Sequence, residues 1–167
     1  RAGRRKEMTA ATRRRKSVSR ITVQCAVTAR NVPAAARIRQ WARAALATDA
    51  RVTIRVVGQA EGRLLNRSYR RRDYATNVLT FVFRDTPPLE GDLALCAPVI
   101  TREARAQRKT VVAHYAHMVM HGMLHLQGFD HENARDAAVM ERRERTLLAR
   151  FGYADPYKPP THRSRNA

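Results

Sequence analysis

The chain has 167 residues, enough for one domain with a real hydrophobic core and too few for two domains of ordinary size. Lys and Arg total 33 against 14 Asp and Glu, which gives a formal charge of +19. This charge favours a polyanionic partner, RNA or DNA first and an acidic membrane surface second. No apolar run approaches the roughly 20 residues of a membrane helix and no secretory signal is visible, so we expect a soluble cytoplasmic protein with no membrane span.

The basic residues are densest at the N-terminus. Residues 1–20 hold nine basic side chains and one acid, and large apolar residues do not recur there at any period. We therefore expect a disordered basic extension over 1–20, with Met8 a candidate for the native start because the given chain begins with Arg. A Pro-rich basic tail is expected over 158–167, which leaves the globular domain at 21–157.

Hydrophobic periodicity predicts nine elements. Four segments have the alternating or continuous apolar pattern of strands: 20–27, 51–57, 77–83 and 91–96. Five segments have apolar residues at helical spacing: 33–46, 59–69, 99–107, 110–127 and 134–150. A loop with Pro87 and Pro88 is expected over 85–91. Because strands come early and helices late, the fold class is α+β, a single domain with a mixed sheet of about four strands packed with helices.

The two cysteines, Cys25 and Cys96, are far apart in the sequence and both lie in apolar runs. This placement predicts two buried free thiols in a reducing compartment rather than a disulfide.

The segment HGMLHLQGFDH contains His121, His125 and His131. The first two are one helical turn apart and can bind a single cation together. Gly128 can adopt the left-handed conformation that ends a helix, which brings His131 back to the same ion. Three neutral imidazoles on zinc leave a fourth position for water, as in catalytic zinc sites. We therefore predict one Zn²⁺ per chain, held on a C-terminal helix and the turn that follows it.

Four further polar residues lie near this segment. His114 and His117 occupy the same face of the predicted helix, and we expect them to pack or to support the ligands rather than to bind the ion. Asp130 and Glu132 flank His131 and could orient it or accept a proton, although exposed turn residues are the favoured interpretation.

The spacing H-x3-H-x5-H, with Gly128 three residues before His131, is metzincin-like except at one position. Gly122 stands where that peptidase pattern has the glutamate that serves as general base, which argues against a peptidase. A metal can still lower the pKa of its bound water to about 7. Cleavage of RNA needs less proton transfer than cleavage of a peptide bond, because RNA carries its own 2′-hydroxyl nucleophile.

The same residues resemble the H-G-x-x-H-x-x-G-x-D-H motif of the YbeY endoribonucleases, also called rRNA maturation factors. LNRSYRRRDYATNVLTFVF, residues 65–83, resembles the L-N-x-x-Y-R-x-x-D-x-P-T-[DN]-V-L-S-F motif of that family, and GDLAL follows in the expected order. The likeness runs from about Arg51 to Tyr157. Ala75 replaces the usual proline and Thr80 the usual serine, which affects the geometry of the turn rather than the chemistry.

The resemblance implies a zinc-dependent, single-strand-specific endoribonuclease that acts in 16S rRNA 3′-end maturation and ribosome quality control. The implied partners are ribosomal RNA and a ribosome or ribosomal protein. The implied zinc ligands are His121, His125 and His131, and Arg70 is the implied catalytic arginine. Three neighbours of Arg70 are expected to bind the substrate: Arg67, Arg71 and Arg72. The alternative is a non-catalytic RNA-binding or ribosome-assembly factor with a structural zinc, and the sequence does not choose an oligomeric state.

Overall fold

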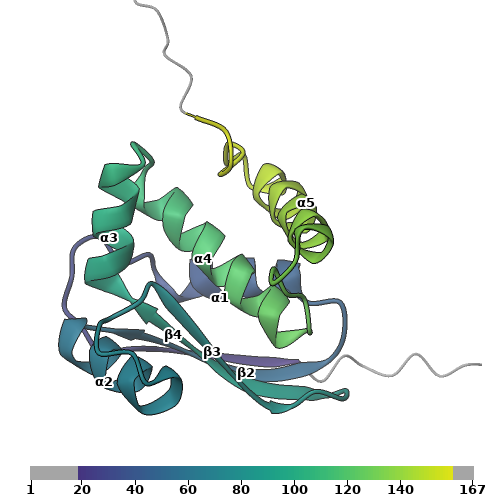
Figure 1. The fold of residues 1–167 in the computed structure, drawn as a ribbon, viewed down its shortest axis with the longest axis horizontal. Coiled ribbons are helices and arrows are strands. Elements are labelled where there is room, and N and C mark those ends of the chain that lie inside the picture. Colours follow the sequence, from purple (N-terminus) through teal and green to yellow (C-terminus); the bar gives the residue numbers. More distant parts are fainter. Residues whose placement is uncertain (1–18, 160–167) are drawn as a thin grey trace, which may run out of the picture.

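The computed structural model describes residues 19–159. The strands are β1 (Arg20–Cys25), β2 (Ala50–Val57), β3 (Val78–Arg84) and β4 (Leu89–Cys96). The helices are α1 (Ala35–Ala45), α2 (Gln59–Arg70), α3 (Ala97–Ala106), α4 (Val111–Leu126) and α5 (Ala134–Arg150). Figure 1 shows α2 on one side of the sheet and α4 across the other, with α5 outside α4. The predicted α+β class is confirmed, and each predicted element is present.

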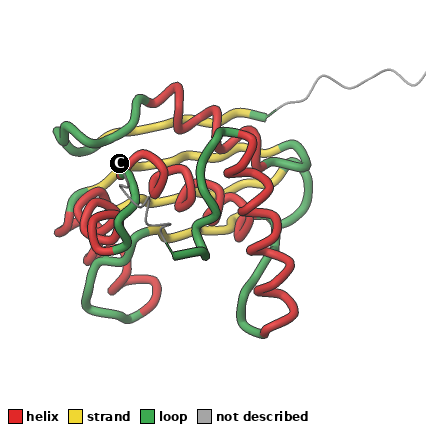
Figure 2. Tube along the Cα trace, turned by 90° about the horizontal axis from the view of Figure 1, so that it is seen from above, coloured by secondary structure: helices red, strands yellow, loops and turns green. Residues whose placement is uncertain are grey.

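The sheet has the order β1-β2-β4-β3. β1, β2 and β4 are parallel, whereas β3 forms an antiparallel edge with β4, so the sheet is mixed as predicted. Figure 2, a view from above, shows the strands side by side. The alternation of side chains along β2 places Val52 and Ile54 in the core, and this is why 51–57 has its β-branched pattern.

The central helix of the core is α4. It packs against α1, α3, α5 and two strands, and Tyr115, Val119 and Met123 are fully buried in it. A helix surrounded by protein is apolar on nearly every side, so α4 lacks a wide polar face. Its N-cap is Thr110, whose hydroxyl accepts a hydrogen bond from the N–H of Ala113 at 3.2 Å. The histidines of this segment are therefore carried by the most firmly packed helix of the domain.

The end of α4 has the geometry that the sequence predicts. Gly128 has φ +88°, in the left-handed region, and its N–H donates to the carbonyl of His125 at 3.0 Å. The N–H of Phe129 donates to the carbonyl of Leu124 at 3.1 Å, which completes the turn. The chain reverses here and runs past the last turn of α4 toward α5.

Two boundary or burial predictions were wrong in detail. β4 begins at Leu89, because its N–H donates to the carbonyl of Asp49 at 2.8 Å, so the loop predicted over 85–91 is shorter. Cys96 is buried as predicted, but Cys25 is exposed, since it lies at the end of an edge strand. β1 begins at Arg20, where the strand predicted over 20–27 begins.

The predicted disordered extension falls mostly on residues 1–18, which lie outside the described residues, as does the basic tail from residue 160 onward. Within residues 19–159, no helix is both long enough and apolar enough to cross a membrane.

Candidate metal centre

The three histidines of the predicted site lie together. His121 and His125 project from α4, and His131 comes from the turn after Gly128. One ring nitrogen from each of the three lies within 4.8 Å of the others. The ring centroid of His125 lies 4.6 Å from that of His121 and 4.9 Å from that of His131. Helix spacing and one left-handed turn therefore bring together side chains that are ten positions apart in the chain.

The donor set fits a divalent cation of the zinc type. Two Zn–N bonds of about 2.0–2.1 Å that meet at a tetrahedral angle place their nitrogens about 3.3 Å apart. The Nε2 atoms of His121 and His125 lie 3.1 Å apart. Burial, followed by the nearby rings of His121 and His131, lowers the pKa of His125 to about 4. Its imidazole is thus neutral at pH 7 and offers a lone pair.

A buried carboxylate in α5 fixes the orientation of His121. Oε1 of Glu144 lies 2.6 Å from Nδ1 of His121, and the Glu144 side chain is 0% exposed. Burial by itself would raise the pKa of Glu144, but hydrogen bonds with His117 and His121 lower it to about 2. An ionised carboxylate can only accept, so Nδ1 of His121 carries the proton and donates. Nε2 is left as the lone-pair atom that faces the other two rings.

The second oxygen of Glu144 binds two more groups. Tyr157 donates its hydroxyl to Oε2, and Nε2 of His117 lies 3.4 Å from the same oxygen. His117 thus lies in contact with the carboxylate that orients His121, and His117, His121 and Glu144 form a second group of possible metal ligands.

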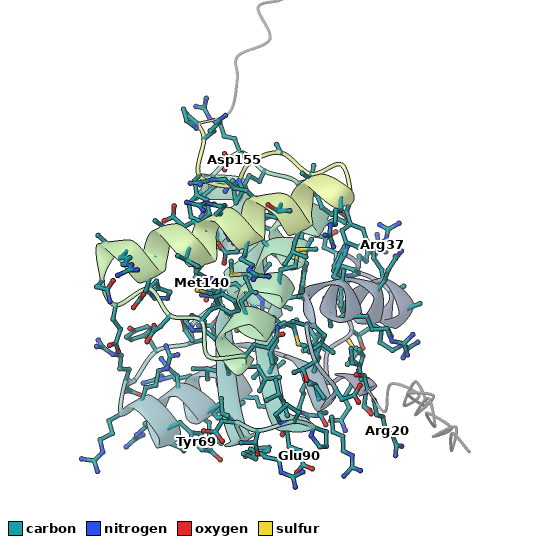
Figure 3. All side chains as sticks on the ribbon, turned by 90° about the vertical axis from the view of Figure 1, so that its right-hand side faces the viewer. Arg20, Arg37, Tyr69, Glu90, Met140 and Asp155 are labelled. Atoms are coloured by element: carbon teal, nitrogen blue, oxygen red, sulfur yellow. The ribbon has the colours of Figure 1, made fainter. Side chains whose placement is uncertain are left out.

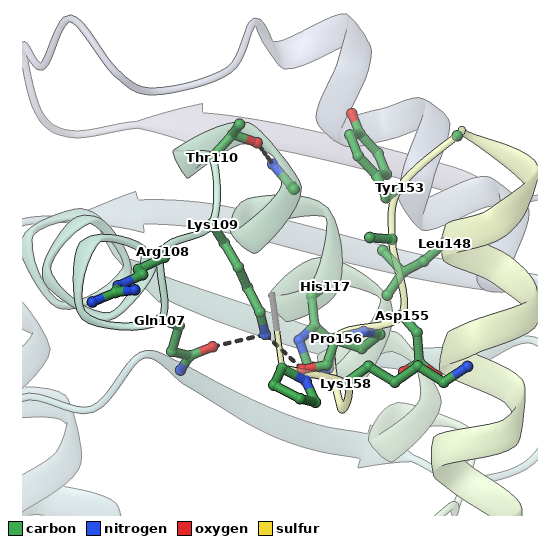
Figure 4. Close-up of a pocket in the computed structure, with 14 residues that line it drawn as sticks. Gln107, Arg108, Lys109, Thr110, His117, Leu148, Tyr153, Asp155, Pro156 and Lys158 are labelled. Carbon is green, nitrogen blue, oxygen red and sulfur yellow. Dashed lines mark hydrogen bonds between the residues drawn. The ribbon is translucent and has the colours of Figure 1, made fainter. Parts of the chain in front are cut away.

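Tyr157 reaches Glu144 because the segment after α5 folds back over the start of α4. Nζ of Lys109 donates to the carbonyl of Pro156 at 2.7 Å and to Oε1 of Gln107 at 2.8 Å, as the dashed lines in Figure 4 show. A cavity of about 520 Å³ remains between this segment and α4, and the His117 ring is part of its wall (Figure 4). The segment carrying Tyr157 is thus held in place beside the centre.

Gly122, next to His121, is required by packing. A Cβ at this position would lie 2.6 Å from Cδ2 of Leu93 and 3.1 Å from Cγ2 of Val78. The carbonyl of Gly122 also accepts a hydrogen bond from the hydroxyl of Thr80 at 3.3 Å. α4 therefore lies close against β3 and β4 at the candidate metal centre. Thr80 provides the same hydroxyl group that the usual serine would provide.

The other polar residues near the segment have structural partners. His114 is buried and binds Oε2 of Glu103 through Nε2 at 2.8 Å, so it belongs to the packing of α3 on α4. Asp130 and Glu132 are exposed, and Oδ1 of Asp130 accepts from the backbone N–H of His131 at 2.7 Å. The favoured interpretation of both acids as exposed turn residues holds, and Asp130 also shapes the turn that carries His131.

The arginines predicted to act on RNA lie at the end of α2, where Tyr69 contacts Phe81 of the edge strand β3. Arg70 ends α2 and Arg71 follows it with φ 56°; both are exposed, as are Arg67 and Arg72. α2 packs under the sheet, on the side opposite α4 (Figure 1). Figure 3 shows Tyr69, the neighbour of Arg70, at the far end of the molecule from α5. Among residues 19–159, no hydrogen bond or salt bridge links Arg70 to the histidines.

Glu144 and Tyr157 were not predicted as site residues from the sequence. A signal for Glu144 existed, because it lies on the same face of α5 as Met140, Leu147 and Leu148, which are all buried. A carboxylate on an apolar helix stripe needs a buried partner. Tyr157 gave no comparable signal, since it lies in a short segment without regular structure.

Taken together, the fold and the site define a small basic α+β protein with a three-histidine candidate metal centre on one helix and the turn that follows. Residues 20–152 match the family model described as Endoribonuclease YbeY. The chain therefore belongs to the endoribonuclease YbeY family, a family of nucleases, and the predicted resemblance is confirmed.

Individual relatives agree with this assignment. Endoribonuclease YbeY of Aromatoleum aromaticum is 56% identical over 140 residues, which cover 82% of this chain and 91% of that protein. Endoribonuclease YbeY of Nitrosomonas eutropha is 53% identical over 137 residues, which cover 82% of this chain and 97% of that protein. The solution structure of TM1509 from Thermotoga maritima has the same fold, with a TM-score of 0.51 at 21% identity, over 83% of this chain and 99% of that one.

Proposed function

We propose that this chain is a zinc-dependent, single-strand-specific endoribonuclease that cleaves ribosomal RNA, in 16S rRNA 3′-end maturation and ribosome quality control. The observation that carries the proposal is the histidine cluster, in which His121 is oriented by the buried carboxylate of Glu144. Membership in the YbeY family supports the choice of RNA as substrate. The proposed site of action is the cytoplasm, with a ribosome or ribosomal protein as a further partner.

In this proposal His121, His125 and His131 hold one Zn²⁺. The bound ion would supply Lewis acidity and lower the pKa of a bound water. The three protein ligands leave a coordination position open, as catalytic sites do. The exposure of His131 leaves the centre accessible from solvent. Glu144 keeps the proton on Nδ1 of His121 and so maintains Nε2 as a ligand atom.

Arg70 is proposed to stabilise the charge that develops on the scissile phosphate, because a guanidinium stays protonated and can bind two oxygens at once. Arg67, Arg71 and Arg72 are proposed to bind the flanking phosphates. Beside them, Tyr69 and Phe81 form an aromatic pair with ring centroids 4.4 Å apart, and Tyr69 is 66% exposed. Exposed aromatic rings beside arginines suit unpaired bases, which can stack where paired bases cannot.

Two other functions fit less well. A metzincin-like peptidase needs an acid at position 122, but a side chain there would collide with Leu93 and Val78. An assembly factor with a structural zinc would be expected to close the site with a fourth protein ligand. Within residues 19–159, one cluster of possible ligands consists of three histidines, and a second cluster, of His117, His121 and Glu144, shares only His121 with it. The proposed globular domain is 21–157, with basic segments at 1–20 and 158–167 beside it.

The test combines metal analysis with cleavage of one defined single-stranded RNA by rigorously repurified protein. Wild type is expected to bind one zinc per chain and to cleave. The His121→Ala, His125→Ala and His131→Ala triple variant should lose both properties. His114→Gln is the matched control, since that histidine lies on the same helix but pairs with Glu103. Zinc at full content in the triple variant would refute the ligand assignment, and zinc without cleavage in wild type would favour the assembly factor.

A further inference from the structure

A second cavity, of about 550 Å³, lies at the carboxyl ends of β1 and β4. Its walls are the loop that follows β1 and one face of α3, from Ala97 to Arg105. It shares no lining residue with the histidine cluster. Its volume lies within the range of about 300–1,000 Å³ that is usual for pockets binding small molecules.

The charged residues of this cavity are all cations. Arg30 comes from the loop after β1, and Arg102 and Arg105 come from α3, three positions apart and therefore on one helix face. Within residues 19–159, no acidic side chain lines the cavity and none of the three arginines forms a salt bridge. Three guanidinium groups that form no salt bridge favour an anionic ligand.

A buried hydroxyl provides independent evidence. Tyr115 of α4 lines the cavity and is 0% exposed, and its hydroxyl has no hydrogen-bond partner among the described residues. Burial, with smaller contributions from the thiols of Cys25 and Cys96, raises the pKa of Tyr115, so the hydroxyl keeps its proton. Buried hydroxyl groups normally have partners, so the Tyr115 hydroxyl is a donor that needs an acceptor.

The start of α3 adds to the positive potential. α3 is ten residues long, and Cys96 before it gives no side-chain cap hydrogen bond. Ala97 and Pro98, in its first turn, line the cavity. The N-terminal end of a helix dipole and its unpaired N–H groups favour anions, phosphate above all.

We propose that this cavity binds the phosphate group of a nucleotide. The guanidinium groups of Arg102 and Arg105 pair with phosphate oxygens, and the Tyr115 hydroxyl donates to one of them. The apolar walls, which include Val27, Val32 and Pro98, leave room for the rest of the nucleotide. The nucleotide belongs either to an RNA strand or to a free nucleoside phosphate, since both present the same group. The proposal does not depend on the metal centre.

The test is a titration of the full-length, zinc-loaded chain with adenosine 5′-monophosphate, followed by NMR at the backbone amides of the first turn of α3. Adenosine at constant ionic strength is the control for contacts without phosphate. A saturable shift with the phosphate and none with adenosine is expected. The variant with both Arg102→Glu and Arg105→Glu should bind at least about tenfold more weakly. Arg37→Glu, which alters an exposed arginine of α1, should bind like wild type.

The Tyr115→Phe variant distinguishes a role of the hydroxyl in ligand binding from a role in folding. It removes only an unpartnered hydroxyl, so its unfolding temperature without ligand should equal or exceed that of wild type. Its affinity for the nucleotide should fall about tenfold. No response at α3, or equal affinities for wild type and both site variants, would overturn the proposal.

A single-stranded oligoribonucleotide without terminal phosphates identifies the source of the phosphate. A loss of RNA binding free energy in the Arg102→Glu and Arg105→Glu variant of more than twice that in Arg37→Glu assigns the site to the RNA strand, because the double variant reverses two charges and the control one. A loss confined to adenosine 5′-monophosphate assigns it to free nucleotides.

Discussion

Nδ1 of His121 donates to Oε1 of Glu144 over 2.6 Å, and this bond joins α4 to the fully buried carboxylate of α5. It decides which ring nitrogen of His121 faces the other two histidines. It also explains why a charged residue is retained on the apolar face of α5, since the carboxylate has three partners there: His121, His117 and Tyr157.

Glu144→Gln should weaken zinc binding about 10- to 100-fold, because the amide no longer holds His121 with a charged acceptor. Competition with a chromogenic chelator measures the affinity. Glu132→Gln is the matched control, as Glu132 is an exposed acid close to the same histidine in sequence. Equal zinc affinities in the two variants would show that Glu144 contributes to folding and not to zinc binding.

Arg70→Glu should abolish RNA cleavage, with a loss of at least about 10²-fold in kcat, while zinc content and folding stay intact. Arg70→Lys should retain partial activity, because lysine keeps the charge but loses the planar fork. Single-turnover cleavage at saturating RNA measures the effect. The contrast is Arg63→Ala, which should mainly weaken binding; Arg63 is an exposed arginine of α2 that also forms a salt bridge of 2.6 Å with Asp73. A wild-type rate for Arg70→Glu would return Arg70 to the general basic surface.

Gly122→Ala should lower the free energy of unfolding by about 1–3 kcal/mol, because the new methyl group meets Leu93 in a packed core. Urea denaturation of the zinc-free protein measures this cost. In a Leu93→Ala background the added methyl gains space, so the two changes together should cost less than the sum of their separate costs. Strict additivity would mean that Leu93 does not restrict position 122.

Glu103→Gln tests a pH-dependent contribution away from the metal centre. Burial opposes ionisation of Glu103, but hydrogen bonds from His114 and Asn77 outweigh it, so its pKa in the folded protein is lowered from the usual 4.5. The folded state therefore binds fewer protons than the unfolded state. The stabilisation is complete above pH 4.5 and is lost as the pH falls through the lower folded pKa.

At neutral pH the Glu103→Gln variant should be less stable than wild type by on the order of 1–3 kcal/mol. The difference should shrink as the pH falls below about 4.5. Chemical denaturation at a series of pH values, with Glu132→Gln as the exposed control, provides the measurement. A difference that stays constant with pH would contradict the ionic origin.

Removal of residues 1–18 should lower RNA affinity and flatten its dependence on salt, because fewer counterions are released from RNA when fewer cations bind it. The cut leaves Ser19 in place, whose hydroxyl accepts a hydrogen bond from the N–H of Ala50 at 3.2 Å. Zinc content should not change. An identical salt slope for the two proteins would mean that the extension does not contact phosphate.

The sequence by itself determined the features that depend on neighbours along the chain. The periods of apolar residues predicted the strands and helices, because backbone geometry repeats every two or 3.6 residues. The histidine cluster was predictable for the same reason. His121 and His125 share one helix face, and Gly128 supplies the one left-handed residue that returns His131 to them. The family motifs also consist of neighbouring residues.

Only the tertiary structure decided which distant groups meet. Glu144 reaches His121 because α5 packs across α4, and no spacing in the sequence predicts that pairing. The exposure of Cys25 follows from the position of β1 at the edge of the sheet, although its apolar surroundings in sequence suggested burial. Position 122 requires a residue without a side chain, because Leu93 and Val78, on two different strands, approach the same point of α4. Such contacts are set by how whole elements pack, so they arise only when the chain is folded.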